Sequence, residues 1–192
     1  MNKYYTTHHN YHHQRHSVDI QYILQRIVSV SYLFNRKGVI IVSKNGGVTE
    51  EKVLEAVLEE SGQKPVLVKI APDLTEAEIT AVAKLAKKLN LAGVIATNTT
   101  VSRDGLKASA SEVAGMGAGG LSGAPLKARA LEVLVLLRKT LDTNFAVISV
   151  GGVETADDVR LRVEHGATLV QGYSGFVYEG HLWARKIKRE IN

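Results

Sequence analysis

The chain has 192 residues, of which 45% are hydrophobic and 22% are charged, so it is long enough for one domain with a buried core. It contains no cysteine, which excludes a disulfide framework and a thiolate zinc site. The formal net charge of +5 comes from residues 1–49, where Asp19 is the only acidic residue, whereas basic and acidic residues balance in the rest of the chain. We therefore expect no nucleic-acid partner, because the folded part lacks a basic excess.

Residues 1–50 are predicted to be a leader that is separate from a folded domain at 51–192. Five of the seven histidines lie in the low-complexity segment 1–17. Imidazole binds zinc, copper and nickel, but we predict no metal site, because nothing near these histidines would orient them. Residues 18–34 have the spacing of an amphipathic helix, which could be a targeting segment, a membrane-surface helix or a helix without a partner. Residues 38–43 are typical of a short strand.

From residue 49 onward, apolar segments alternate with helical patterns. Predicted helices span 50–60, 75–90, 125–141, 155–165 and 180–191, and predicted strands span 65–71, 93–98, 146–150 and 167–171. Thr75 and Glu78 have the spacing of a capping box at the start of the second helix. The strands are continuous apolar runs, which is typical of a parallel sheet with both faces buried. The sequence therefore predicts an α/β fold of about four parallel β/α units, as a half-barrel or an open doubly wound sheet.

Polar residues and glycines follow the predicted strands, at the edge where parallel α/β folds bind ligands. Lys69 is the only charge within its apolar strand, and it could bind an anion or simply extend its ammonium group to the surface. Asn98 ends the next strand and could bind a polar ligand or cap a turn. Ser122, between glycines in the loop 100–124, could orient a ligand or be an ordinary loop serine.

The last two strands are followed by Gly151-Gly152 and by Gly172-Tyr173-Ser174. Glycine lets backbone N–H groups approach an anion closely, and helices begin shortly after both segments. The loops after the last two strands are also where (β/α)8 barrels frequently hold phosphate. These segments therefore indicate a phosphate site, although Tyr173 could equally well be a packing residue.

Four segments, in the same order and spacing, resemble the carboxyl-terminal half of the dihydroorotate dehydrogenase family. They are KPVLVKIAPDL at 64–74, TNTTVSR at 97–103, GGLSG at 119–123 and SVGG at 149–152. The resemblance extends from about Val53 to the end of the chain, and the TNTT form points to the quinone-linked class. It implies the carboxyl-terminal half of a (β/α)8 TIM barrel with FMN as cofactor. The implied reaction is oxidation of (S)-dihydroorotate to orotate in pyrimidine biosynthesis, with a quinone as electron acceptor.

The resemblance also implies a role for individual residues. Lys69 and Thr97 would lie beside the flavin ring, where Lys69 would stabilise negative charge. Asn98 and Thr99 would bind the pyrimidine substrate. The remaining positions would bind the cofactor, around its ring and ribityl chain or at its phosphate: Ser122, Gly123, Gly151, Gly152, Tyr173 and Ser174. Ser174 stands where the family often has threonine, and both residues provide a hydroxyl group. The implied location is peripheral to a membrane, on the cytoplasmic face of the cell membrane or on the mitochondrial inner membrane in a eukaryote.

The family's catalytic base lies on a loop in the first half of the barrel, and residues 1–50 contain no counterpart, so no catalytic residue is assigned. A complete barrel needs about 250 residues, so we expect a truncated chain without turnover of its own. Open strand edges and uncovered apolar faces would favour self-association. Two alternatives stay open: another phosphate-binding barrel enzyme, such as an aldolase-like or indole-synthase-like one, and a degenerate non-enzymatic fragment with a His-rich metal-binding segment.

Overall fold

A single parallel sheet organises the part of the chain that the computed structural model describes, residues 39–41 and 50–191. Its strands are β1 (Val39–Ile41), β2 (Leu67–Ile70), β3 (Gly93–Ala96), β4 (Ala146–Val150) and β5 (Leu169–Gln171). Each strand pairs in parallel with the next strand along the chain. Successive β/α units whose crossover connections have the same handedness produce this strand order. The predicted α/β fold is therefore confirmed. The His-rich tract 1–17 and the helix predicted at 18–34 lie outside the described residues.

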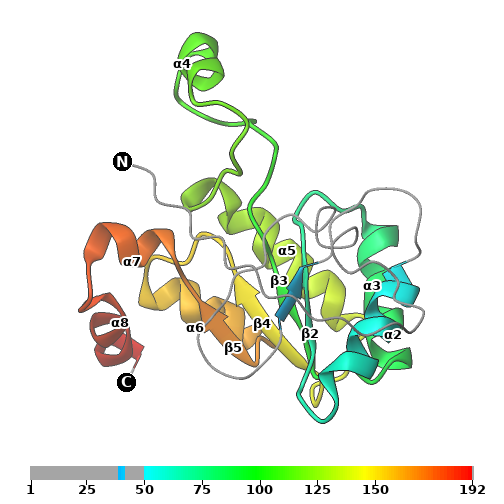
Figure 1. Cartoon of the computed structure of the whole chain (residues 1–192). Coiled ribbons are helices and arrows are strands. Elements are labelled where there is room, and N and C mark those ends of the chain that lie inside the picture. Colours follow the sequence, from blue (N-terminus) through cyan, green and yellow to red (C-terminus); the bar gives the residue numbers. More distant parts are fainter. Residues whose placement is uncertain (1–38, 42–49, 192) are drawn as a thin grey trace, which may run out of the picture.

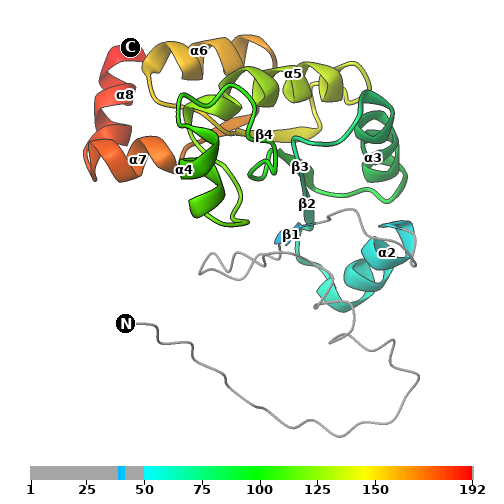
Figure 2. The same ribbon diagram turned by 90° about the horizontal axis from the view of Figure 1, so that it is seen from above.

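The helices of the main layer cover one face of this sheet. They are α2 (Glu50–Ser61), α3 (Glu76–Lys88), α5 (Lys127–Arg138) and α6 (Ala156–Glu164), and α3, α5 and α6 follow one another along the sheet (Figure 2). Apolar side chains of α2, α3 and α5 meet Val68, Ile70, Val94 and Val147 from the strands in the main core. A helix with an apolar face must bury that face against another element, and here the sheet provides it.

The opposite face of the sheet is less covered by the described residues. Along β2, Val68 and Ile70 are buried, whereas Leu67 and Lys69 are only partly buried. Leu169 in β5 is 60% exposed. The sequence predicted strands with both faces buried, and among β2 to β5 only β3 is buried at every position. The apolar runs do form the strands, but the described helices occupy one face only.

Strand β1 lies within the short strand predicted at 38–43, and its pairing with β2 places these three residues in the sheet. Two other elements were not predicted from the sequence. Helix α4 (Ala110–Gly115) interrupts the predicted loop 100–124 and stands away from the body (Figure 1). Helix α7 (Ser174–Glu179) lies where no helix was predicted, before α8 (Trp183–Ile191), which corresponds to the helix predicted at 180–191. Both α4 and α7 have six residues, which is too short for a helical period to be recognised.

Local signals fix the ends of several helices. The capping box predicted at Thr75 is confirmed, because the Glu78 backbone N–H donates to Thr75 Oγ1 while the Thr75 N–H donates to Glu78 Oε2 at 2.8 Å. Thr155 and Ser109 form the same motif at α6 and α4. A short 3-10 turn, η1 (Ala124–Leu126), leads into α5. Within residues 50–191, no helix has both the length and the apolar character needed to cross a membrane.

Candidate functional site

A cavity of about 630 Å³ opens where the carboxyl ends of β2, β3, β4 and β5 meet their following loops. All the residues predicted from the sequence to form the site line it, and they are Lys69, Thr97, Asn98, Thr99, Ser122, Gly123, Gly151, Gly152, Tyr173 and Ser174. The carboxyl ends of parallel strands share one edge of the sheet, which brings these segments together. The volume is in the range of small-molecule and cofactor sites. What each residue binds stays a prediction.

Six further residues line the cavity: Ile95, Gly120, Leu126, Val150, Val153 and Gln171. None of them was assigned an individual role from the sequence, although Gly120 and Val150 lie within the GGLSG and SVGG motifs. Four of them are apolar and looked like ordinary core positions in their runs. Gln171 is the last residue of β5, so a polar side chain at a strand end was the available signal. The four apolar residues add apolar surface to the lining of the cavity.

Lys69 brings a positive charge to the cavity. It lies beside Ile95 of β3 in the parallel register, on the less covered face of the sheet. Burial lowers the pKa of Lys69, and no carboxylate among the described residues opposes this effect. A partly desolvated ammonium group that has no counter-ion within residues 39–41 and 50–191 is favourably placed to attract negative charge from a ligand.

The loop after β3 is held by its neighbours through its backbone. The Thr97 N–H donates to Val150 of β4, and the Asn98 N–H donates to Ile70 of β2, both at 2.8 Å. The Thr97 side chain is buried, at 1% exposure, while that of Asn98 is partly buried. The backbone is therefore fixed between two strands, and the amide of Asn98 stays available to a ligand.

Thr100 connects this loop to two other segments. Its hydroxyl group donates to Asp73 Oδ1 at 2.5 Å, and its backbone pairs with Leu121 in an isolated antiparallel bridge. Asp73 lies within the KPVLVKIAPDL motif at 64–74, but no individual role was assigned to it from the sequence. These contacts hold three segments together at the mouth of the cavity: the loop after β2, the loop after β3 and the GGLSG loop.

Glycines in the GGLSG loop allow close approaches across the cavity mouth. A Cβ on Gly120 would lie 2.6 Å from Thr99 Cβ, so a larger residue there would require Thr99 to shift. The hydroxyl groups of Ser122 and Ser174 are 3.0 Å apart and hydrogen-bonded. This contact joins the GGLSG loop to the loop after β5.

The loop after β4 has a backbone that glycine permits. Gly151 and Gly152 have φ values of +120° and +68°. A Cβ on Gly152 would lie 2.6 Å from both the N and the Cα atoms of Lys127, at the start of α5. Within the described part of the chain, the backbone N–H groups of Gly152 and Ser174 donate to no protein acceptor. Two unused donors lining one cavity are suited to an anion such as phosphate.

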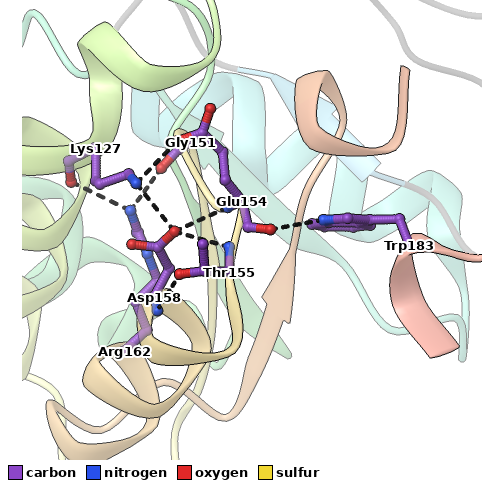
Figure 3. A network of polar contacts seen from close by, with 7 residues as sticks. All are labelled: Lys127, Gly151, Glu154, Thr155, Asp158, Arg162 and Trp183. Carbon is purple, nitrogen blue, oxygen red and sulfur yellow. Dashed lines mark hydrogen bonds and ion pairs between the residues drawn. The ribbon is translucent and has the colours of Figure 1, made fainter. Parts of the chain in front are cut away.

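A polar network lies behind this loop (Figure 3). The Asp158 carboxylate accepts hydrogen bonds from the backbone N–H groups of Glu154 and Thr155 at 3.0 Å and pairs with the Lys127 ammonium group at 3.1 Å. Burial alone would raise the pKa of Asp158, but these contacts outweigh it and hold the pKa below its ordinary value. The Trp183 indole N–H donates to the Glu154 carbonyl oxygen at 2.8 Å, which connects α8 to the same loop.

Arg162 completes the network and was missed in the sequence, where it is one of several charged residues of α6. Its side chain is 2% exposed, and its guanidinium group donates to Ser149 Oγ at 2.7 Å and to the Gly151 carbonyl oxygen at 2.5 Å. Burial lowers the pKa of Arg162, while Asp158 opposes this effect. The loop after β4 is therefore held from behind by a buried cation.

Within residues 39–41 and 50–191, no group of three or more His, Asp or Glu residues could hold a metal ion.

Comparisons with known proteins place this geometry in a family. A profile of the family described as dihydroorotate dehydrogenase matches residues 25–192. The dihydroorotate dehydrogenase (quinone) of Leifsonia xyli subsp. xyli is 61% identical over 140 residues, which cover 73% of this chain and 41% of that protein. The protein of the same name from Thermobifida fusca is 57% identical over 136 residues, covering 70% of this chain and 36% of that protein.

Solved structures agree with the sequence relatives. The crystal structure of dihydroorotate dehydrogenase from Eimeria tenella in complex with ferulenol is 38% identical, with a TM-score of 0.61, and the match covers 67% of this chain and 33% of that one. The ligand-free form of the same enzyme matches with the same score. The chain thus spans about two fifths of the length of the curated relatives it matches.

Proposed function

The chain belongs to the dihydroorotate dehydrogenase family, and we propose that its cavity is the cofactor- and substrate-binding part of a quinone-linked member of that family. The proposed reaction is oxidation of (S)-dihydroorotate to orotate, in pyrimidine biosynthesis. The observation that carries the proposal is the meeting of all the predicted site residues around one cavity. The resemblance recognised from four motifs is confirmed by the family match, which leaves no support for another phosphate-binding barrel family.

The residues of the cavity fit FMN, the flavin that we propose as cofactor. The unused backbone N–H groups of Gly152 and Ser174 suit its phosphate, and apolar Ile95 and Val150 suit a flat ring. Lys69 would stabilise negative charge on that ring. When bound, FMN supplies the acceptor for the hydride that dihydroorotate loses.

Asn98 and Thr99 are proposed to bind the pyrimidine substrate. The Asn98 amide can donate and accept hydrogen bonds, which matches the alternating N–H and C=O groups of a pyrimidine ring edge. The hydrogen bonds from the Thr97 N–H to β4 and from the Asn98 N–H to β2 fix where this amide can lie. Among the described residues we assign no catalytic base.

Flavin binding by the purified chain tests this function. FMN and riboflavin are titrated in parallel, with quenching of flavin fluorescence as the readout, because riboflavin lacks the phosphate. We expect FMN to bind more tightly than riboflavin, and orotate to perturb the spectrum of the bound flavin. Equal affinity for the two flavins, or binding of neither, would contradict the proposed site.

Turnover decides between an enzyme and the non-enzymatic alternative. We expect the FMN-loaded chain alone to reduce no dye with dihydroorotate, because the described residues provide no base. Sustained, dihydroorotate-dependent dye reduction would show that the chain is an enzyme by itself and would overturn that expectation.

The proposed electron acceptor is a quinone, the acceptor in the names of the relatives. A lipid-soluble acceptor supports peripheral association with a membrane, either the cytoplasmic face of the cell membrane or the mitochondrial inner membrane. We also propose self-association, because Leu169 on the sheet and Phe176, Val177 and Tyr178 on α7 expose apolar side chains. Co-sedimentation with lipid vesicles tests the membrane association, and light scattering tests the self-association. A monomer that does not sediment with vesicles would contradict both proposals.

A further inference from the structure

We infer that Arg162 is a positioning residue for phosphate recognition, acting through the peptide that joins Gly151 to Gly152. This inference rests on the proposed function, because it concerns how the same cavity would hold the phosphate of FMN. Arg162 itself lies behind the loop, is 2% exposed and does not line the cavity. Its role is to determine where a backbone N–H group points.

The geometry of a peptide bond provides the link. In a trans peptide, the carbonyl oxygen of one residue and the N–H of the next lie on opposite sides of one plane. Arg162 donates to the Gly151 carbonyl oxygen at 2.5 Å, so that oxygen points toward the guanidinium group. The N–H of Gly152 therefore points away from Arg162. Gly152 lines the cavity, and this N–H is unused within the described residues.

Glycine makes such an anchor necessary. A peptide flanked by two glycines can rotate between orientations that other residues would forbid. Gly151 and Gly152, at φ +120° and +68°, both use this freedom. Without a fixed donor to hold it, the Gly151 carbonyl oxygen could turn toward the cavity and repel an anion. Arg162 makes the orientation that exposes the N–H the favoured one.

The remaining contacts keep the guanidinium group in place. The nitrogen that binds the Gly151 carbonyl oxygen also donates to the Lys127 carbonyl oxygen at 3.2 Å (Figure 3). The other terminal nitrogen donates to Ser149 Oγ at 2.7 Å. Ser149 pairs with Ala96 of β3, whose side chain is in the core under the helices. Arg162 thus joins strand β4, the loop that follows it and the start of α5. The planar guanidinium group has enough donors to bind all three at once.

Arg138 offers a matched control at the other end of the sheet. It also anchors backbone, donating to the carbonyl oxygens of Gly166 at 2.8 Å and of Asp142 and Phe145. These residues precede β4 and β5, away from the cavity. A loss of Arg138 should therefore lower stability without changing which flavin the chain prefers.

The test compares the ratio of FMN to riboflavin affinity in the full chain and its variants. We expect Arg162→Met to lower FMN affinity by roughly 10- to 100-fold while riboflavin affinity changes little, because a charge-assisted anchor is lost and only FMN has a phosphate. Arg162→Lys keeps the positive charge but not the planar guanidinium group. Its ratio of FMN to riboflavin affinity should therefore lie between those of Arg162→Met and the wild type. Arg138→Met should leave the ratio as in the wild type while lowering the melting temperature.

Each outcome separates the inference from the function on which it rests. A wild type that prefers FMN, together with Arg162 variants that keep the same preference, would overturn the inference alone. If Arg162→Met does not fold, Arg162→Lys decides, and an unchanged ratio in that variant overturns the inference. A wild-type chain that binds neither flavin overturns the proposed function and this inference with it.

Discussion

The close packing of the loop after β4 against α5 predicts that Gly152→Ala is more destabilising than its small size implies. An alanine at φ +68° costs about 1–2 kcal/mol, because its Cβ crowds the following carbonyl oxygen. The same Cβ would lie 2.6 Å from the N and Cα atoms of Lys127, which are backbone atoms and cannot rotate away. Overpacking of this kind costs about 1–3 kcal/mol more. We therefore expect a loss of roughly 2–5 kcal/mol in the free energy of unfolding.

Urea unfolding of the purified chain measures this loss, and Gly62→Ala is its control. Gly62 has a similar φ, +58°, but nothing lies within 4 Å of the Cβ that alanine would add. The control should lose only the backbone contribution, about 1–2 kcal/mol. A Gly152→Ala variant no less stable than Gly62→Ala would refute the claim that close packing on α5 requires glycine at this position.

Two further predictions concern side chains that line the cavity. Burial lowers the pKa of Lys69 from its ordinary 10.5, so the unfolded chain binds this proton more firmly than the folded one. The free energy of unfolding therefore rises with pH between the pKa of Lys69 in the folded chain and 10.5. Below this window, the buried charge of Lys69 destabilises the fold, so Lys69→Met should raise the melting temperature of the ligand-free chain at neutral pH. This increase should become smaller as the pH rises through the window. The same variant should bind FMN roughly tenfold more weakly, and a variant with unchanged FMN affinity would contradict the role of the charge. Asn98→Ala should weaken orotate binding to the FMN-loaded chain by roughly 3- to 10-fold with FMN affinity retained, and parallel losses of both would indicate a structural role instead.

The edge-of-sheet residues were predictable because their position follows from topology. Once the strands are recognised as parallel, their carboxyl ends must lie together, so the sequence pattern alone places Lys69, Asn98 and Gly151 near one another. Their chemistry was also visible, as a charge within an apolar run, an amide at a strand end and paired glycines. The cavity at the ends of β2 to β5 contains all three.

The supporting residues could not be predicted, because their partners are distant in the sequence. Arg162 is in a charged helix, and its buried position depends on packing against Ser149 and Gly151. Asp73 acquires its role only through the hydrogen bond from Thr100. Strand β1 was recognised as a pattern, but its pairing with β2 is a long-range contact that a local pattern does not contain.

The central claim is that the loops after β4 and β5 hold the phosphate of FMN while Lys69 lies beside its ring. A crystal structure of the chain with FMN tests it most directly. We predict that the phosphate lies about 3 Å from the backbone nitrogens of Gly152 and Ser174, with the flavin ring over Ile95 and the Lys69 ammonium group at its edge. A phosphate bound away from these two nitrogens, or a flavin outside the cavity, would contradict the account.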